Sequence, residues 1–117
     1  MFLSEAAAKV GAQILTQQAP AAIPVERVCA SDRMSEVLDK ASSRTLLVTH
    51  LVSRHVLHAA HLMDMPGVCF AKGVRPGPEL VAKAERQGTM LMVSPLEMDE
   101  IAGRLRADMA DAICAPA

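Results

Sequence analysis

Short apolar runs alternate along this chain with segments in which apolar residues recur at helical spacing. Four of the runs are brief and rich in aliphatic or β-branched residues, which predicts strands. One of them, Thr45–Leu51, is apolar almost throughout, a pattern typical of a strand buried on both faces of a sheet. The predicted strands lie within residues 25–30, 45–51, 68–71 and 89–93.

A predicted helix follows each strand and begins at a residue suited to a helix N-terminus. This alternation predicts a right-handed, mainly parallel sheet with helices on both faces. The expected fold is therefore α/β, with three layers, α/β/α, and about four to five short strands. The first helix is capped by Ser31 or Asp32 and carries Met34, Val37, Leu38 and Ala41, and the others open at Ser53, Pro78 and Ser94-Pro95.

The N-terminal segment is less regular. Ser4 caps a predicted short helix that runs through Val10 and ends at Gly11. Ala12–Thr16 is either a short strand or a continuation of this helix past a tolerated glycine. Ala19–Pro24 is a linker whose prolines exclude regular structure. We expect a single domain over residues 1–117, with its core in residues 25–109 and a frayed tail from residue 110.

Polar residues stand where each predicted strand ends. The carboxyl ends of parallel strands meet at one edge of a sheet, and open α/β sheets bind ligands there. We therefore expect a ligand crevice at this edge. The candidate ligand-binding residues are Ser31, Asp32, Thr49, His50, Ser53, Lys72, Gly73 and Ser94.

Five short segments form a pattern that is distributed along the chain. They are Ala30-Ser-Asp32, Met34-Ser-Glu-Val-Leu38, Leu46-Leu-Val-Thr-His-Leu51, Met65-Pro-Gly-Val68 and Val93-Ser-Pro95. Taken together, these segments resemble the DRTGG domain family over roughly Val25 to Leu105, although the letters DRTGG do not occur contiguously. His50 stands where the family usually has glycine after the strand threonine.

The resemblance implies a fold like the N-terminal domain of HPr kinase/phosphorylase. It also implies a non-catalytic regulatory or dimer-forming module, which in multidomain relatives accompanies phosphotransacetylases and nucleotide-sensing CBS pyrophosphatases. Stand-alone members are often associated with iron-only hydrogenase systems. A homodimer and an enzyme partner are therefore expectations that this resemblance supplies.

Histidines provide the most reactive candidate side chains. His50 ends a buried strand, where it can donate to an anionic ligand, act as a base if Asp32 orients it, or be satisfied by the backbone of a turn. Three more histidines follow Arg54 on one predicted helix, at positions 55, 58 and 61. We interpret them as a solvated face, because an arginine is a poor neighbour for a bound metal cation.

The loop after the third predicted strand carries Lys72, Gly73, Arg75 and Gly77, which suggests anion contact at the rim of the crevice. Its spacing is neither a P-loop nor a dinucleotide fingerprint. Two prolines in the same loop remove donors that a phosphate cradle would use.

Composition excludes several classes of function. The net charge is −1 and aromatic residues make up 2%, which excludes an electrostatic or stacking surface for nucleic acid. Eight methionines indicate an adaptable core or interface. The three cysteines are too far apart for a zinc or iron–sulfur site, so Cys29 and Cys69 are predicted to be buried thiols. With neither a basic leader nor a long apolar stretch, we expect a soluble, cytoplasmic protein without a membrane span.

Two hypotheses of function follow. The first is a non-catalytic regulatory or interaction module that self-associates and binds a small anionic or nucleotide-like ligand through Asp32, Thr49, His50, Lys72 and Ser94. In this hypothesis it is accessory to a hydrogenase or another metabolic enzyme system. The alternative is a small enzyme, or enzyme subunit, that uses His50 as acid or base. No cofactor or metal ligand set is identified.

Overall fold

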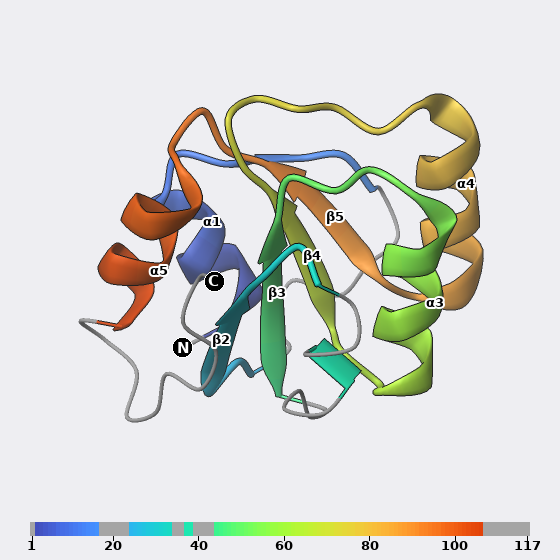
Figure 1. The fold of residues 1–117 in the computed structure, drawn as a ribbon, viewed down its shortest axis with the longest axis horizontal. Helices are drawn as coiled ribbons and strands as arrows, with labels where there is room; N and C mark the ends of the chain where they lie inside the picture. The colour runs from blue at the N-terminus through green and yellow to red at the C-terminus, as the bar shows by residue number, and fades with distance from the viewer. Residues whose placement is uncertain (1, 17–23, 34–36, 39–43, 107–117) are drawn as a thin grey trace.

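A five-stranded sheet forms the centre of the computed structural model, which describes residues 2–16, 24–33, 37–38 and 44–106 (Figure 1). The predicted three-layer α/β fold is confirmed. The strands are β1 (Gln13–Ile14), β2 (Arg27–Ala30), β3 (Thr45–Thr49), β4 (Gly67–Phe70) and β5 (Met90–Val93). The helices are α1 (Leu3–Lys9), α3 (Arg54–Leu62), α4 (Pro78–Gln87) and α5 (Met98–Arg106).

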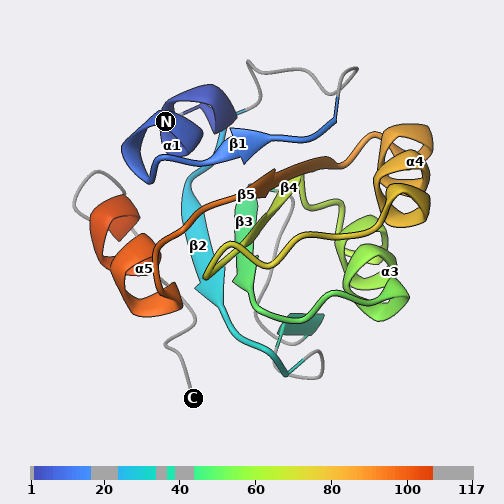
Figure 2. The ribbon, with the colours of Figure 1, turned by 90° about the horizontal axis from the view of Figure 1, so that it is seen from above.

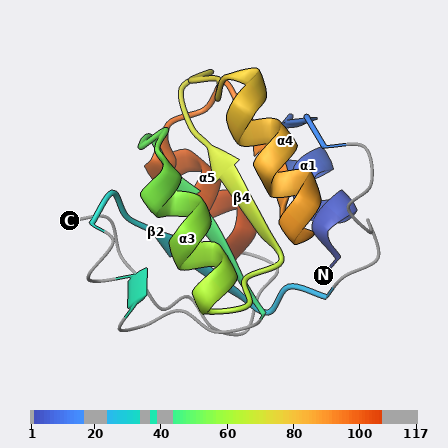
Figure 3. The same ribbon diagram turned by 90° about the vertical axis from the view of Figure 1, so that its right-hand side faces the viewer.

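The sheet has the order β1-β5-β4-β3-β2, and β2 to β5 are parallel neighbours in chain order. Crossovers between adjacent parallel strands are right-handed, so successive ones place their helices on the same face. Accordingly α3 and α4 lie side by side on one face (Figure 3). The chain then leaves β5 for the opposite face, where α5 lies beside α1 and packs on β2 and β3 (Figure 2).

Two apolar cores fill the spaces between the sheet and its helices. Successive side chains of a strand point to opposite faces. In β3, Leu46 and Val48 face α1 and α5, whereas Leu47 faces α3 and α4. All five residues of β3 are buried, as its continuous apolar pattern predicts. The largest fully buried side chain is Phe70, in the second core.

The segment after α1, for which the sequence allows a strand or a helix, contains the strand β1. Gly11 has a φ of 63° and lets the chain turn away from α1. β1 then pairs antiparallel with β5, with Gln13 opposite Val93. The predicted cap at Ser4 is wrong: α1 begins two residues earlier than predicted, at Leu3, and Phe2 is its N-cap. The Glu5 carboxylate accepts a hydrogen bond from the Phe2 amide and so satisfies the helix start.

Two glycines are required by the local backbone. Gly88 ends α4 with a φ of 80°, which confirms the predicted C-cap. Gly67 opens β4 under α1, where a Cβ atom would lie 3.1 Å from Leu3 Cδ2 and 3.2 Å from the Met90 carbonyl oxygen. A side chain at this position would therefore require the Leu3 side chain or the β5 backbone to move by a few tenths of an ångström.

Four methionines and two cysteines of the described residues lie in the interior. Met65, Met90, Met92 and Met98 are buried, in agreement with core packing. Cys69 is the predicted buried thiol, and its burial raises the pKa to about 12. Cys29 is also buried, but it is disulfide-bonded, so the predicted free thiol at this position is wrong.

Some predictions fall outside the described residues. These include Met34 and Ala41 of the first predicted helix and the tail from residue 110, although residues 37–38 are helical as expected. In the described part of the chain, no helix is long and apolar enough to cross a membrane.

Candidate functional site

Four charged or titratable side chains, one from the turn after each parallel strand, meet at the carboxyl edge of the sheet. Asp32 follows β2, His50 follows β3 and Lys72 follows β4, while Glu97 lies between β5 and α5. His50 Nδ1 lies 3.3 Å from Asp32 Oδ2, and His50 Nε2 lies 4.0 Å from Glu97 Oε2. Lys72 Nζ completes the row at 3.5 Å from Glu97 Oε1. The predicted convergence of the strand ends is therefore present.

Asp32 is the acceptor at the centre of this edge. Its Oδ1 accepts hydrogen bonds from Thr49 Oγ1 at 2.6 Å and from the His50 amide at 2.8 Å. Partial burial alone would raise the pKa of Asp32. The hydrogen bonds from Thr49 and His50, together with the His50 ring, outweigh this effect and hold the pKa below its ordinary value of 3.8. Asp32 is thus an ionised acceptor that ties the β2 turn to the β3 turn.

His50 is oriented by this carboxylate. An ionised carboxylate only accepts hydrogen bonds, so the proton of the ring lies on Nδ1, toward Asp32. His50 Nε2 has essentially no solvent-accessible surface and no hydrogen-bond partner among the described residues, because Glu97 at 4.0 Å is beyond hydrogen-bond distance. The reactive nitrogen of His50 is therefore enclosed between the strand turn and the last helix.

The hydroxyls at this edge organise the turns. Thr49 Oγ1 donates to Asp32 and accepts from the Leu51 amide at 3.1 Å. Ser31 Oγ accepts from the Arg33 amide at 3.0 Å, the short side-chain-to-backbone contact that starts a turn. Both side chains fix the backbone that presents Asp32 and His50.

The turns after β4 and β5 are bonded to each other. Lys72 and Gly73 adopt left-handed conformations, with φ values of 59° and 69°. Their amides donate to the carbonyl oxygens of Leu96 and Ser94, each at 2.8 Å. These two amides are consequently bonded within the protein. They are not available to an anion, contrary to what the glycines in the loop sequence suggest.

A cavity of about 370 Å³ opens beside this row of side chains. Three carboxylates line it, against the cationic side chain of Arg33 and the His50 ring. Its residues are Ser31, Asp32, Arg33, His50, Glu97, Met98 and Asp99. Only Ser31, Asp32 and His50 among them are candidates from the sequence.

The other candidates lie elsewhere. Ser94 is fully buried, and its Oγ donates to the Val10 carbonyl and accepts from the Leu96 amide, which makes it a structural link between β5 and α1. Ser53 lines a second and larger groove between α3 and α4. The cavity is not lined by Thr49, Lys72 or Gly73. Their hydrogen bonds and ion pair connect the neighbouring strand turns.

Arg33, Glu97 and Asp99 are the cavity residues used below that sequence reasoning missed. Asp99 lies in the first turn of the last helix, where the helix dipole favours acidic residues, and Glu97 directly precedes that helix. The cavity also departs from the rule that predicted it. Ligand crevices of open α/β sheets form where strand order reverses, but β2 to β5 follow each other without reversal. The cavity arises because α5 crosses to β2 and β3 and closes over their turns.

Among the described residues, no group of three or more His, Cys, Asp or Glu side chains is arranged so that it could hold a metal ion. The histidines of α3 form the expected solvated face, since His55, His58 and His61 are exposed.

Fold and cavity together define an α/β domain with a polar site at the carboxyl edge of its parallel strands. No protein-family model and no curated protein matches the chain. Among solved structures, the chain is similar to the CBS and DRTGG domains of the regulatory region of Clostridium perfringens pyrophosphatase, complexed with the activator diadenosine tetraphosphate. The TM-score is 0.69 at 9% sequence identity, over 88% of this chain and 45% of that one. The likeness shows a shared fold, in agreement with the DRTGG-like architecture, and this chain spans less than half of that structure.

Proposed function

We propose that this chain is a non-catalytic regulatory module that binds a small nucleoside-containing ligand in the cavity beside Asp32 and His50. The observation that carries the proposal is the row of interacting side chains from all four strand ends, with a cavity of about 370 Å³ along it. This volume falls within the range of small-molecule sites. The solved regulatory region with the same fold was complexed with a nucleotide activator, which supports a ligand of this class.

The charges of the cavity favour a nucleoside over a bare anion. Asp32, Glu97 and Asp99 are acceptors and repel a ligand that presents only negative charge. Ribose hydroxyls and exocyclic amines are donors, and acidic side chains bind ribose hydroxyls in dinucleotide-binding folds. Arg33 is the cationic side chain on the same wall and suits a single phosphate.

A regulatory role follows from the placement of the walls. Asp32 and His50 belong to strand turns, whereas Glu97 and Asp99 belong to the start of α5. A ligand that bridges these walls has a higher affinity for the protein with α5 docked than for the protein with α5 displaced. Binding therefore shifts the equilibrium toward docked α5.

Thermal unfolding with adenosine and AMP tests the proposal. A ligand at 100 times its Kd adds about 2.7 kcal/mol of stability, so at least one of these ligands raises the midpoint. The increase is lost in Asp32→Asn and Glu97→Gln. The matched control Glu26→Gln changes an exposed carboxylate that pairs with Arg44, and it keeps the ligand response. A response that survives in both cavity variants contradicts the proposal, as does the absence of any response.

An enzyme is the second candidate, because Asp32 orients the His50 ring as a general base requires. The enclosure of Nε2 argues against it, since a substrate cannot reach this atom without displacement of Glu97 or the ring. If turnover of a nucleotide is found, His50→Ala abolishes it under this second reading. Under the regulatory reading, the same variant alters ligand affinity and no turnover exists to lose.

Self-association and an enzyme partner also remain part of the proposal. The methionine-rich surface expected to drive self-association is not supplied by Met65, Met90, Met92 or Met98, because all four are buried. The homodimer and the hydrogenase link thus rest on the family resemblance. Light scattering of the purified protein measures the first directly: a monomer at micromolar concentration contradicts it.

A further inference from the structure

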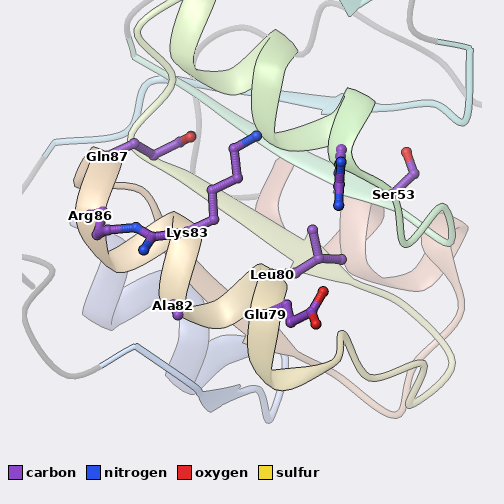
Figure 4. Close-up of a pocket in the computed structure, with 8 residues that line it drawn as sticks. Ser53, Glu79, Leu80, Ala82, Lys83, Arg86 and Gln87 are labelled. Carbon is purple, nitrogen blue, oxygen red and sulfur yellow. The ribbon is translucent and has the colours of Figure 1, made fainter.

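The outer face of the helix pair α3 and α4 holds a second and larger hollow. It is a groove of about 850 Å³ and is lined from the start of α3 and along α4 (Figure 4). It lies on the face of the sheet opposite α5, so it is separate from the cavity at Asp32. No part of the proposed function uses it.

Three cations line this groove against one carboxylate. Arg54 lies at the start of α3, and Lys83 and Arg86 lie on α4, whereas the single acidic lining residue is Glu79. None of the three cations has an ion-pair partner within the described residues. In Figure 4 the Lys83 side chain extends toward α3, and Glu79 lies toward the other end of α4 from Arg86. The groove therefore carries a net positive charge, because one carboxylate opposes three cations.

Hydrogen-bond donors accompany these cations at the start of α3. Ser53 is the N-cap but makes no side-chain capping bond, and its Oγ has no hydrogen-bond partner among the described residues. The first amides of α3 consequently lack a side-chain acceptor, and this end of a helix favours negative charge. Ser53 and Arg54 both line the groove, which places the helix N-terminus at one wall.

The two walls are held at a fixed spacing. Gln87 of α4 donates from Nε2 to the Leu57 carbonyl of α3 at 3.0 Å and to Thr89 Oγ1 at 2.8 Å. From Glu79 to Arg86 the helix rises by about 10 Å, and Leu80 adds an apolar patch between them. A pre-formed groove of this length, mainly apolar in its lining surface and carrying three basic side chains, suits a chain of several phosphates better than a single small anion.

We propose that the groove between α3 and α4 binds the phosphate chain of a polyphosphate-bearing small molecule, either a nucleoside triphosphate or inorganic polyphosphate. Arg54, Lys83 and Arg86 neutralise the phosphates, and the first amides of α3 supply hydrogen bonds at one end. The proposal stands apart from the nucleoside cavity at Asp32, since it involves other residues on another face.

Calorimetric titration of the full chain with inorganic tripolyphosphate, ATP and adenosine tests this assignment. We expect tripolyphosphate and ATP to bind with a Kd below about 1 mM, that is, more than about 4 kcal/mol, and to weaken at high salt. The double variant Lys83→Glu/Arg86→Glu weakens tripolyphosphate binding at least tenfold, and Lys83→Arg keeps it. Glu79→Gln strengthens it, because the one opposing carboxylate is removed. The matched control Lys72→Glu alters a cation at the sheet edge and leaves tripolyphosphate binding unchanged.

Amide chemical shifts locate the site even if the double variant folds poorly. Tripolyphosphate shifts the amides of residues 53–54 and 79–87 in the unaltered protein if the assignment is right. The proposal is overturned if the shifts are confined to residues 31–33 and 97–99. It is also overturned if Lys72→Glu abolishes tripolyphosphate binding while Lys83→Glu/Arg86→Glu leaves it intact. No tripolyphosphate binding at about 10 mM also overturns it. If a polyglutamate peptide binds and tripolyphosphate does not, the proposal is also overturned, and the groove is assigned to an acidic protein partner instead. Adenosine binding at the Asp32 cavity is scored separately and bears only on the proposed function.

Discussion

Asp32→Asn removes one negative charge from the edge of the sheet and preserves the size of the side chain. In the native protein, the carboxylate accepts three hydrogen bonds, from Thr49 Oγ1 at 2.6 Å, the His50 amide at 2.8 Å and His50 Nδ1 at 3.3 Å. The amide oxygen of asparagine still accepts the first two bonds. Its NH₂ group is a donor, so the third contact persists only when the His50 ring carries its proton on Nε2 and accepts through Nδ1.

The expected loss of stability follows from these bonds. A hydrogen bond to a charged group contributes about 1.5–3 kcal/mol, against about 1 kcal/mol for a neutral one. In Asp32→Asn, two short hydrogen bonds lose their charged acceptor. The free energy of unfolding would therefore fall by up to a few kcal/mol. Asp32 is 47% exposed, so solvent screening reduces this value. We expect the free energy of unfolding to fall by about 1–2 kcal/mol at pH 7, which corresponds to a midpoint lowered by roughly 5–10 °C.

The difference between the two proteins depends on pH in a defined direction. The pKa of Asp32 is lower in the folded state than its ordinary value of 3.8, so its contribution is present above that value. It is lost as the pH falls through the folded pKa. The gap between wild type and Asp32→Asn is therefore constant near neutrality and narrows in acid below about pH 4.

Urea unfolding, followed by circular dichroism between pH 3 and pH 7, measures this gap. Glu26→Gln is the control, because Glu26 pairs with Arg44 at 2.6 Å but is 58% exposed, and an exposed pair contributes only about 0.5 kcal/mol. Equal losses in the two variants at pH 7 would refute the account of Asp32 given above. A gap that widens in acid would refute the sign of its pKa shift.

Three further outcomes follow from the core and the strand turns. Thr49→Val removes the hydroxyl that donates to Asp32, so the pKa of Asp32 rises in an NMR titration of its carboxyl carbon, whereas Thr49→Ser leaves it near the wild-type value. Gly67→Ala lowers stability by about 1–3 kcal/mol in urea unfolding, because its Cβ would press on the Met90 carbonyl; the control Gly103→Ala has open space around it, and any loss there speaks against the steric argument. Cys69, with its pKa raised to about 12 by burial, is alkylated by iodoacetamide at pH 8 only after urea unfolds the protein, and fast labelling of the native protein in a mapped peptide contradicts its burial.

The layers of the fold are readable from the sequence because its patterns are local. The unbroken apolar run of β3 predicts burial on two faces, and the proline and glycine that bound α4 mark its ends to the residue. The start of α1 is less readable. Ser4 lies inside α1, and the N-cap is Phe2, a residue type that the usual preference for Ser, Thr, Asp or Asn at this position does not predict.

The candidate site is only half readable. Asp32, Thr49 and His50 follow neighbouring strands, so the meeting of parallel strand ends predicts their proximity. Glu97 and Asp99 are set by the path of α5, which depends on how the last helix packs across the sheet and not on any local pattern. Ser94 is predicted as a ligand-binding residue because it follows a strand. Its hydroxyl instead donates to the carbonyl of Val10, the C-cap of α1.

The path of α5 also has a kinetic meaning. The helix returns from β5 to cover β2 and β3, so the two walls of the cavity are separated by more than sixty residues of chain, from Asp32 to Glu97 and beyond. A contact so distant in sequence forms only when most of the sheet is already assembled. Conversely, fraying of α5 by itself erases the cavity while the strands persist. Amide hydrogen exchange in α5 therefore reports whether the cavity is occupied. A bound ligand slows exchange in this helix more than it slows exchange in the sheet.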